Sequence, residues 1–309
     1  MQRNPHELHP TVDVRQPERR RILQLLLGLV VFVGSRVLTT LAAVLVFAVT
    51  AEATGVVSVG EILSAPGPAA PVGFLVGAAF SILGFVLVVR FVSRRRVTEF
   101  SRAGAVSEIG IGLLVGFGVV AATVGLLAAI GVYRVTEVQL GWGVLTGIMF
   151  GVGPAIVEEI FFRGFLLRIL DGWVGSWGAL AIVSVLFALV HSFSSPAGPV
   201  AAVYVFLSAS LLLNMAWFLT RRLWLPIALH LAFNASQSAL FGLNVSGSEA
   251  GDGLLRAELS GPEWLTGGVM GGEGSLVLIV IALAAGVVMA VAGVRRGAML
   301  PRASRSAAS

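Results

Sequence analysis

Residues 151–170 read GVGPAIVEEIFFRGFLLRIL and place two carboxylates and a guanidinium inside a long apolar run. On a helix, Glu159 and Arg163 are four positions apart, so they share a face and can pair. Glu158 lies one step, about 100°, around the same helix and can point elsewhere. Ionisable groups within a membrane helix are costly and usually mark function. The stretch therefore predicts a polar site buried in an apolar helix.

The composition around this stretch is typical of a membrane protein. Of the 309 residues, 57% are hydrophobic and 12% are charged, whereas a soluble domain carries about 25% charged residues. Cys is absent, which excludes disulfides, Cys-ligated zinc and thiol catalysis. The net charge of +5 comes from Arg clusters at the ends of apolar runs. Such clusters indicate membrane topology and not a nucleic-acid partner.

Eight apolar runs are long enough to cross a bilayer, which takes about 20 mostly apolar residues. They are residues 22–50, 71–92, 108–132, 142–169, 175–193, 199–219, 223–242 and 275–294. Glycines spread through these runs favour close packing between helices. The predicted fold class is therefore all-α, a polytopic transmembrane helix bundle of about eight spans.

The distribution of Arg predicts which side of the membrane each connection faces. With the N-terminus inside, the inner segments hold sixteen of the 21 basic residues. The outer connections hold only Arg134 and Arg256, together with eight acidic residues. This positive-inside pattern predicts an even number of spans and cytoplasmic N- and C-termini. We expect an integral, multi-pass protein of the cytoplasmic (plasma) membrane.

The predicted organisation has five parts. A cytoplasmic tail (1–21) precedes accessory transmembrane helices (22–141), a core that carries the polar site (142–242), an outer loop (243–274), and the last transmembrane helix with a cytoplasmic tail (275–309). The outer loop is rich in Gly, Ser and acidic residues, which favours a solvated connector over a lid.

Two further runs carry polar residues that an apolar helix does not need. The fifth run ends LFALVHSFSSP, with His191, and the seventh reads WLPIALHLAFNASQ, with His230 and Asn234 on one face. Peptide hydrolysis suits this set, because Glu158 and His191 can activate a water. His230 and Asn234 can donate hydrogen bonds to the oxyanion. Alternatively, Glu158, His191 and His230 could bind one zinc ion, since two His and a carboxylate form a catalytic zinc set.

Three motifs, in order on apolar runs, resemble the CPBP family, the CAAX proteases and bacteriocin-processing proteins also called the Abi family of intramembrane proteases. They are Glu-Glu-x-x-x-Arg (Glu158, Glu159, Arg163), Phe-x-x-x-His (Phe187, His191) and His-x-x-x-Asn (His230, Asn234), all within residues 142–242. The resemblance implies that 142–242 is the catalytic core of a type II CAAX prenyl endopeptidase-like enzyme, either a metalloprotease or a glutamate protease.

Residue by residue, the resemblance implies that Glu158 and His191 activate the water. It also implies that His230 and Asn234 form the oxyanion hole. The supporting residues would be Glu159, Arg163 and Phe187. The implied partners are the lipid bilayer and a membrane-embedded or lipidated protein or peptide substrate, and zinc is an optional cofactor.

The same residues also have structural interpretations. Glu159 and Arg163 could be a structural ion pair, and His230 with Asn234 could join helices by hydrogen bonds. The functional alternatives to an intramembrane endopeptidase are a non-catalytic membrane scaffold or immunity protein and a proton-coupled transporter. Arg36, in the first run, has no partner that the sequence identifies.

Overall fold

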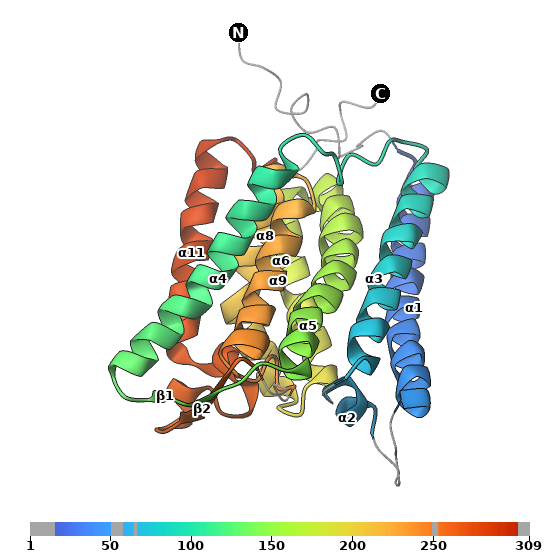
Figure 1. The fold of residues 1–309 in the computed structure, drawn as a ribbon. Coiled ribbons are helices and arrows are strands. Elements are labelled where there is room, and N and C mark those ends of the chain that lie inside the picture. Colours follow the sequence, from blue (N-terminus) through green and yellow to red (C-terminus); the bar gives the residue numbers. More distant parts are fainter. Residues whose placement is uncertain (1–15, 51–57, 65–66, 249–252, 302–309) are drawn as a thin grey trace.

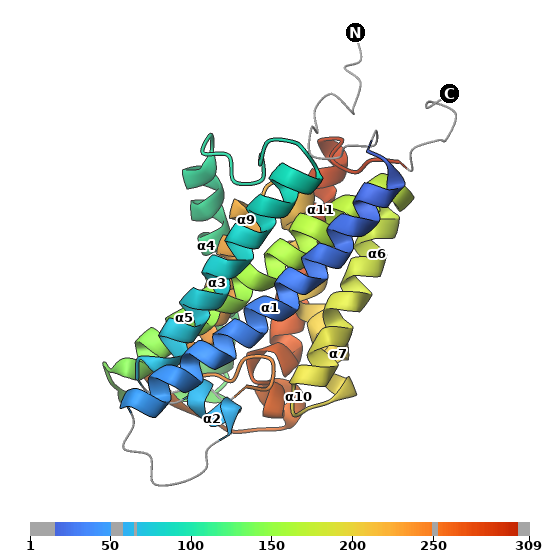
Figure 2. The same ribbon diagram turned by 90° about the vertical axis from the view of Figure 1, so that its right-hand side faces the viewer.

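The structure, a computed structural model, describes residues 16–50, 58–64, 67–248 and 253–301. Long helices that run between two ends form a bundle (Figures 1 and 2). The predicted fold class, an all-α polytopic bundle, is confirmed. The bundle helices are α1 (Glu18–Thr50), α3 (Ala69–Leu87) with π-helical η2 (Val88–Val92), α4 (Ala105–Ala129), α5 (Trp142–Glu159) with π-helical η3 (Ile160–Leu167), α6 (Arg168–Ser194), α7 (Pro199–Val205) with π-helical η4 (Phe206–Ser210), α8 (Leu211–Thr220), α9 (Trp224–Ala235) with π-helical η5 (Ser236–Leu240), and α11 (Leu276–Arg295).

Within the described residues, six helical stretches are long and apolar enough to cross a membrane. One of them, Trp142–Phe193, has 52 residues, more than twice the length of about 20 that a span needs. The chain turns inside it at Gly175, where φ is 78° and ψ is 169°, so the fourth and fifth predicted runs are two helices joined without a loop. The seventh predicted run corresponds to α9 and η5, which are shorter, with 12 and 5 residues. The number of membrane crossings stays a prediction.

Small residues bring α4 and α5 close to α9, the helix that carries His230. A methyl group on Gly116 of α4 would lie 2.3 Å from the backbone oxygen of Leu229. A methyl group on Gly151 of α5 would lie 2.8 Å from the backbone oxygen of Leu231. Because neither position has room for a side chain, glycine sets the distance at which these helices pack.

One end of the bundle gathers most of the Arg residues, and we call it the arginine end. Here α1 begins, α11 ends, and the loop between η2 and α4 meets the turn between α8 and α9 (Figure 1). Hydrogen bonds join these segments, from Gln16 to the backbone of Ser93 and from Arg221 to the backbone of Ala298. The segments predicted to share one side of the membrane therefore do share one end of the structure. Which side that end faces stays a prediction.

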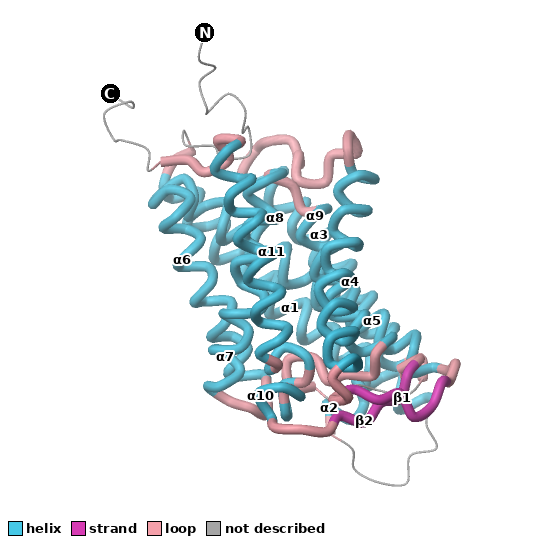
Figure 3. Tube along the Cα trace, turned by 90° about the vertical axis from the view of Figure 1, so that its left-hand side faces the viewer, coloured by secondary structure: helices cyan, strands magenta, loops and turns pink. Residues whose placement is uncertain are grey.

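The opposite end, which we call the loop end, carries the short elements (Figure 3). These are α2 (Val59–Ser64), β1 (Tyr133–Val138), β2 (Leu255–Leu259), α10 (Glu263–Thr266), and two 3-10 turns, η6 (Gly268–Met270) and η7 (Gly272–Gly274). The sequence did not predict the antiparallel strand pair β1–β2. This pair joins two predicted outer connections, and Tyr133 lies opposite Leu259.

The solvated-connector interpretation of the outer loop is wrong for residues 243–248 and 270–274, whereas residues 260–264 are exposed. Val245, Met270 and Glu273 are only 2%, 1% and 3% exposed. Val245 forms β-bridges with Ser248 and Gly271, which closes the two parts of the loop against each other. The loop is packed over the bundle because its apolar residues enter the core and its glycines permit tight turns. Residues 249–252 lie outside the described residues.

We expect Gly116→Val to destabilise the protein by about 1–3 kcal/mol, because overpacking forces α4 away from the α9 backbone. Gly118→Val is the matched control on the same helix, α4, since a methyl group at Gly118 would meet nothing within 4 Å. Thermal unfolding of both variants in detergent checks the expectation. Equal melting temperatures would show that the α4–α9 contact does not depend on glycine.

Candidate active site

The Glu159–Arg163 pair lies at the centre of the bundle. Both side chains are fully buried, and Arg163 Nη1 donates to Glu159 Oε1 over 2.8 Å. Glu159 ends α5 and Arg163 lies in η3, so the π-helical turn keeps the two on one face. Such a pair is stable in an apolar core only when further hydrogen bonds satisfy its remaining groups.

Two other helices supply part of those hydrogen bonds, while Arg163 Nη2 and Glu159 Oε2 are buried without a hydrogen-bond partner. His230 on α9 directs Nδ1 at Glu159 Oε1 over 2.9 Å. Asn214 on α8 accepts from Arg163 Nε through Oδ1 over 3.1 Å and donates to Ser184 Oγ over 2.9 Å. Sequence reasoning missed Asn214, although an amide within the apolar run SASLLLNMAW was a signal for it.

Phe187 on α6 connects the pair to the second histidine. The Arg163 guanidinium carbon lies 4.5 Å from the centre of the Phe187 ring, a cation–π contact. The ring of His191 lies 4.8 Å from the same ring. The Phe187 carbonyl oxygen is 2.8 Å from His191 Nδ1. A carbonyl can only accept, so Nδ1 carries a proton, and Nε2 of a neutral His191 keeps a free lone pair.

Glu158 faces His191 across a short gap. His191 Nε2 is 3.9 Å from Glu158 Oε2, which is too far for a direct hydrogen bond. Oε2 is buried and has no hydrogen-bond partner. Two polar groups at such a separation are commonly bridged by a water molecule. The other oxygen, Oε1, lies 3.4 Å from Arg36 Nη1.

Arg36 therefore has a partner that the sequence did not identify. It lies well inside α1, and its side chain is 47% exposed beside a carboxylate that is 9% exposed. The pairing joins α1 to α5, the helix that carries Glu158.

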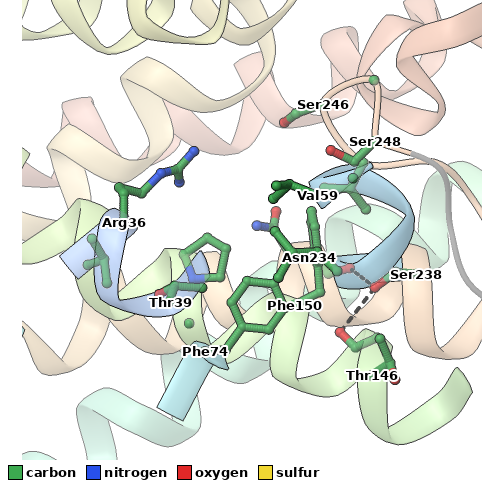
Figure 4. A pocket seen from close by; sticks show the side chains of 18 of the residues that line it. Arg36, Thr39, Val59, Phe74, Thr146, Phe150, Asn234, Ser238, Ser246 and Ser248 are labelled. Atoms are coloured by element: carbon green, nitrogen blue, oxygen red, sulfur yellow. Dashed lines mark hydrogen bonds between the residues drawn. The ribbon is translucent and has the colours of Figure 1, made fainter. Parts of the chain in front are cut away.

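A cavity of about 780 Å³ connects this site to the loop end. Its inner wall includes Glu158, His191, His230 and Asn234, so the structure brings all four predicted catalytic residues to one cavity. Its rim includes the exposed segment 58–61 and residues 245–248. Figure 4 shows Arg36 and Asn234 approaching the cavity from different helices, with Ser246 and Ser248 on the loop beside it.

Glu273, in η7, adds a carboxyl group that sequence reasoning treated as part of a solvated loop. Its side chain is buried and accepts a hydrogen bond from Ser246 Oγ over 2.7 Å. Burial raises the pKa of Glu273 above its ordinary value of 4.5, and the nearby charge of Glu158 raises it further. The hydrogen bond from Ser246 and the charges of His191 and His230 oppose that rise. The loop thus places an acid near the catalytic residues.

The three residues considered as zinc ligands do not form a ligand set in this arrangement. Among the described residues, no group of three or more His, Cys, Asp or Glu side chains could hold a metal ion. As they are arranged, Glu158, His191 and His230 therefore do not fit a zinc ion.

Comparison with known families gives one match. Residues 140–236 match the family model described as type II CAAX prenyl endopeptidase Rce1-like. The matched range contains all three motifs, from Glu158 to Asn234. The predicted resemblance to the CAAX proteases is therefore confirmed. No curated protein and no solved structure matches the chain.

We expect Asn214→Leu to destabilise the protein by about 1–3 kcal/mol, because it leaves Arg163 Nε buried without an acceptor. Ser184→Ala is the matched control, since it removes the partner of the Asn214 amide but leaves the acceptor for Arg163 in place. Thermal unfolding in detergent compares the two. A smaller loss for Asn214→Leu than for Ser184→Ala would contradict the role of Asn214 in holding Arg163.

We expect Glu273→Gln to stabilise the protein at pH 8 and to have little effect at pH 4. A carboxyl whose pKa is raised in the folded state keeps a proton that the unfolded chain releases, so stability falls as pH rises above about 4.5. Gln cannot ionise and still accepts from Ser246, so it removes this loss. Melting temperatures of wild type and variant across this pH range provide the test. A constant difference between the two would count against a buried acid at position 273.

Proposed function

Because this integral, multi-pass membrane protein contains an Rce1-like type II CAAX prenyl endopeptidase domain, we propose that it is an intramembrane endopeptidase. Water activated by Glu158 and His191 hydrolyses a peptide bond within the cavity. The observation that carries the proposal is the partnerless Glu158 Oε2, which faces the free lone pair of His191 Nε2 at the inner end of the cavity.

The water molecule lies between these two groups and donates one hydrogen bond to each. As its oxygen attacks the substrate carbonyl carbon, one of its protons passes to Glu158 or His191, which acts as general base. The same group then returns the proton to the leaving amine as the peptide C–N bond breaks. The products are a carboxylic acid and an amine, which exchange a proton to give a carboxylate and an ammonium ion, and the site recovers its starting protonation state.

Two donors stabilise the oxyanion of the tetrahedral intermediate. Asn234 supplies its amide N–H from the cavity wall. His230 can donate from Nε2 only when both ring nitrogens carry protons, because Nδ1 already points at Glu159. Arg163 and Phe187 act as positioning residues, since they hold Glu159 and the two histidines.

Arg36 also acts on the catalytic carboxylate. It lies near Oε1 and leaves Oε2 available to the water.

The proposed substrate is a membrane-embedded or lipidated protein or peptide, and the proposed location is the cytoplasmic (plasma) membrane. The apolar helices present the site within the bilayer, and the family description supplies the precedent for a prenylated substrate. The donor geometry around Glu158 favours a metal-independent, glutamate-type reaction.

We expect Glu158→Gln to lower cleavage by at least about 10²–10⁴-fold, because Gln cannot accept the proton of the water. The assay uses purified protein in detergent with a panel of prenylated C-terminal peptides and transmembrane peptides. Glu137→Gln is the control, since Glu137 forms an exposed pair with Arg256 on β1 and β2. Unchanged thermal unfolding of Glu158→Gln would separate loss of chemistry from loss of fold.

The assay is repeated with a metal chelator, and we expect cleavage to persist. Loss of cleavage with chelator, restored by added zinc, would contradict the metal-independent reaction but not the role of Glu158. Equal cleavage by wild type and Glu158→Gln would contradict the proposed chemistry. Absence of cleavage by both, in a fully folded protein, would favour a non-catalytic scaffold.

A further inference from the structure

The cavity is closed toward the arginine end. Beyond Glu158, the described residues Phe162, Arg163 and Phe187 are at most 1% exposed. Below them the core continues through Phe165 and Leu167, which are fully buried. Two polar contacts follow, the buried contact of Arg168 with Gln24 and the partly buried contact of Arg95 with Glu99. Within the described residues, a peptide therefore has no route to the site from this end.

The cavity is open toward the loop end. Residues Ser58, Gly60 and Glu61 on its rim are exposed, and the same cavity is lined by Glu158. The wall is also accessible at Arg36, halfway along α1. A substrate can thus approach from the loop end, or from the side of the bundle at the depth of Arg36.

The charges at the two ends differ in sign. Within the described residues, the arginine end carries Arg19, Arg20, Arg21, Arg94, Arg95, Arg96, Arg102, Arg168, Arg221, Arg222, Arg295 and Arg296. The loop end carries Arg134 and Arg256 against Glu61, Glu137, Glu258, Glu263 and Glu273. Arg-rich connections stay in the cytoplasm during membrane insertion. The loop end, and with it the cavity opening, therefore faces the non-cytoplasmic side.

We propose that the substrate enters from the non-cytoplasmic side, and that the substrate class is the non-cytoplasmic end of a membrane-anchored segment. This inference rests on the proposed endopeptidase function. A cytoplasmic C-terminal tail meets the closed arginine end of the bundle, so it is not the substrate of this chain, although the family description names CAAX prenyl substrates.

The depth of the site restricts the substrate further. Glu158 is the seventeenth residue of α5, counted from Trp142 at the loop end, which places it about 24 Å along the helix at 1.5 Å per residue. An extended peptide needs about seven residues to reach that depth at 3.3–3.6 Å each. The scissile bond must therefore lie in an extended tail or an unwound helix end, and not beside a folded domain.

Thr146 provides a partner for such an extended backbone. Its Oγ1 is buried, has no hydrogen-bond partner and belongs to a residue of the cavity wall. An unwound segment in the bilayer must satisfy its own N–H and C=O groups. Polar wall atoms that the fold leaves without partners meet that requirement.

The absence of Cys makes the side of entry directly measurable. Ser248→Cys places one thiol at the cavity rim, and Ala103→Cys places one thiol on the exposed loop at the arginine end. Intact cells that express each full-length variant are treated with a membrane-impermeant maleimide. We expect labelling of Ser248→Cys in intact cells, and of Ala103→Cys only after permeabilisation. The reverse pattern would overturn the proposal.

A second arm tests the substrate class. One cleavable extended segment is placed at either the non-cytoplasmic or the cytoplasmic end of the same membrane helix, and each reporter is co-expressed with wild type or Glu158→Gln. We expect cleavage of the first reporter by wild type and loss of that cleavage with Glu158→Gln. Cleavage of the cytoplasmic reporter alone would overturn the proposal.

The failure of this inference is distinguishable from the failure of the proposed function. Both reporters are also presented to purified protein in detergent, where both ends are accessible. If both reporters are cleaved in detergent but only the cytoplasmic reporter is cleaved in cells, the proposed side of substrate entry is wrong. The proposed endopeptidase function is then still supported. If neither reporter is cleaved in detergent, the protease is in question, but the labelling pattern still decides the side on which the cavity opens.

Discussion

The site depends on how one buried cation, Arg163, is compensated. A guanidinium without exposed surface is stable in an apolar core only when its charge is paired and hydrogen bonds hold it, and at Arg163 only Nη2 has no hydrogen-bond partner. Glu159 supplies the charge and Asn214 supplies a second acceptor. Because Glu159 also faces His230, the same centre fixes α9 relative to α5. These contacts hold three helices that are separate in sequence, and they position the residues predicted to be catalytic.

This compensation separates two adjacent glutamates into different kinds of group. Glu159 is fully buried, and its Oε1 meets both Arg163 and His230, so a change in its protonation would leave a cation unbalanced. Glu158, rotated by about 100° on the same helix, reaches the cavity with Oε2 free of protein partners. Only the Glu158 carboxylate can exchange a proton with water without disturbing the core. The difference in chemistry between identical side chains therefore follows from helix geometry and from Arg163.

The parts of this structure that were predictable from sequence rest on local signals. The length of apolar runs predicts helices, and polar residues inside those runs predict the gathering of Glu158, His191, His230 and Asn234 at one cavity. The partner of Arg36 was not predictable, because the contact of α1 with α5 depends on packing that no spacing in the sequence records. The burial of the outer loop was not predictable either, since Gly-rich and acidic segments usually lie in solvent. Its burial follows from tertiary contacts such as the bridge between Val245 and Gly271.

Hydrolysis inside an apolar bundle requires water and polar partners for the substrate, and the cavity supplies both from the same side. A bilayer offers neither to an unwound peptide. The packed aromatic layer around Phe162 and Phe187 excludes water from one direction, while the rim at residues 58–61 and 245–248 connects the site to solvent from the other. Water and substrate must therefore share one entrance. In the proposed reaction, an extended segment that fills the cavity would displace most of its water and retain the molecule between Glu158 and His191, beside the scissile bond.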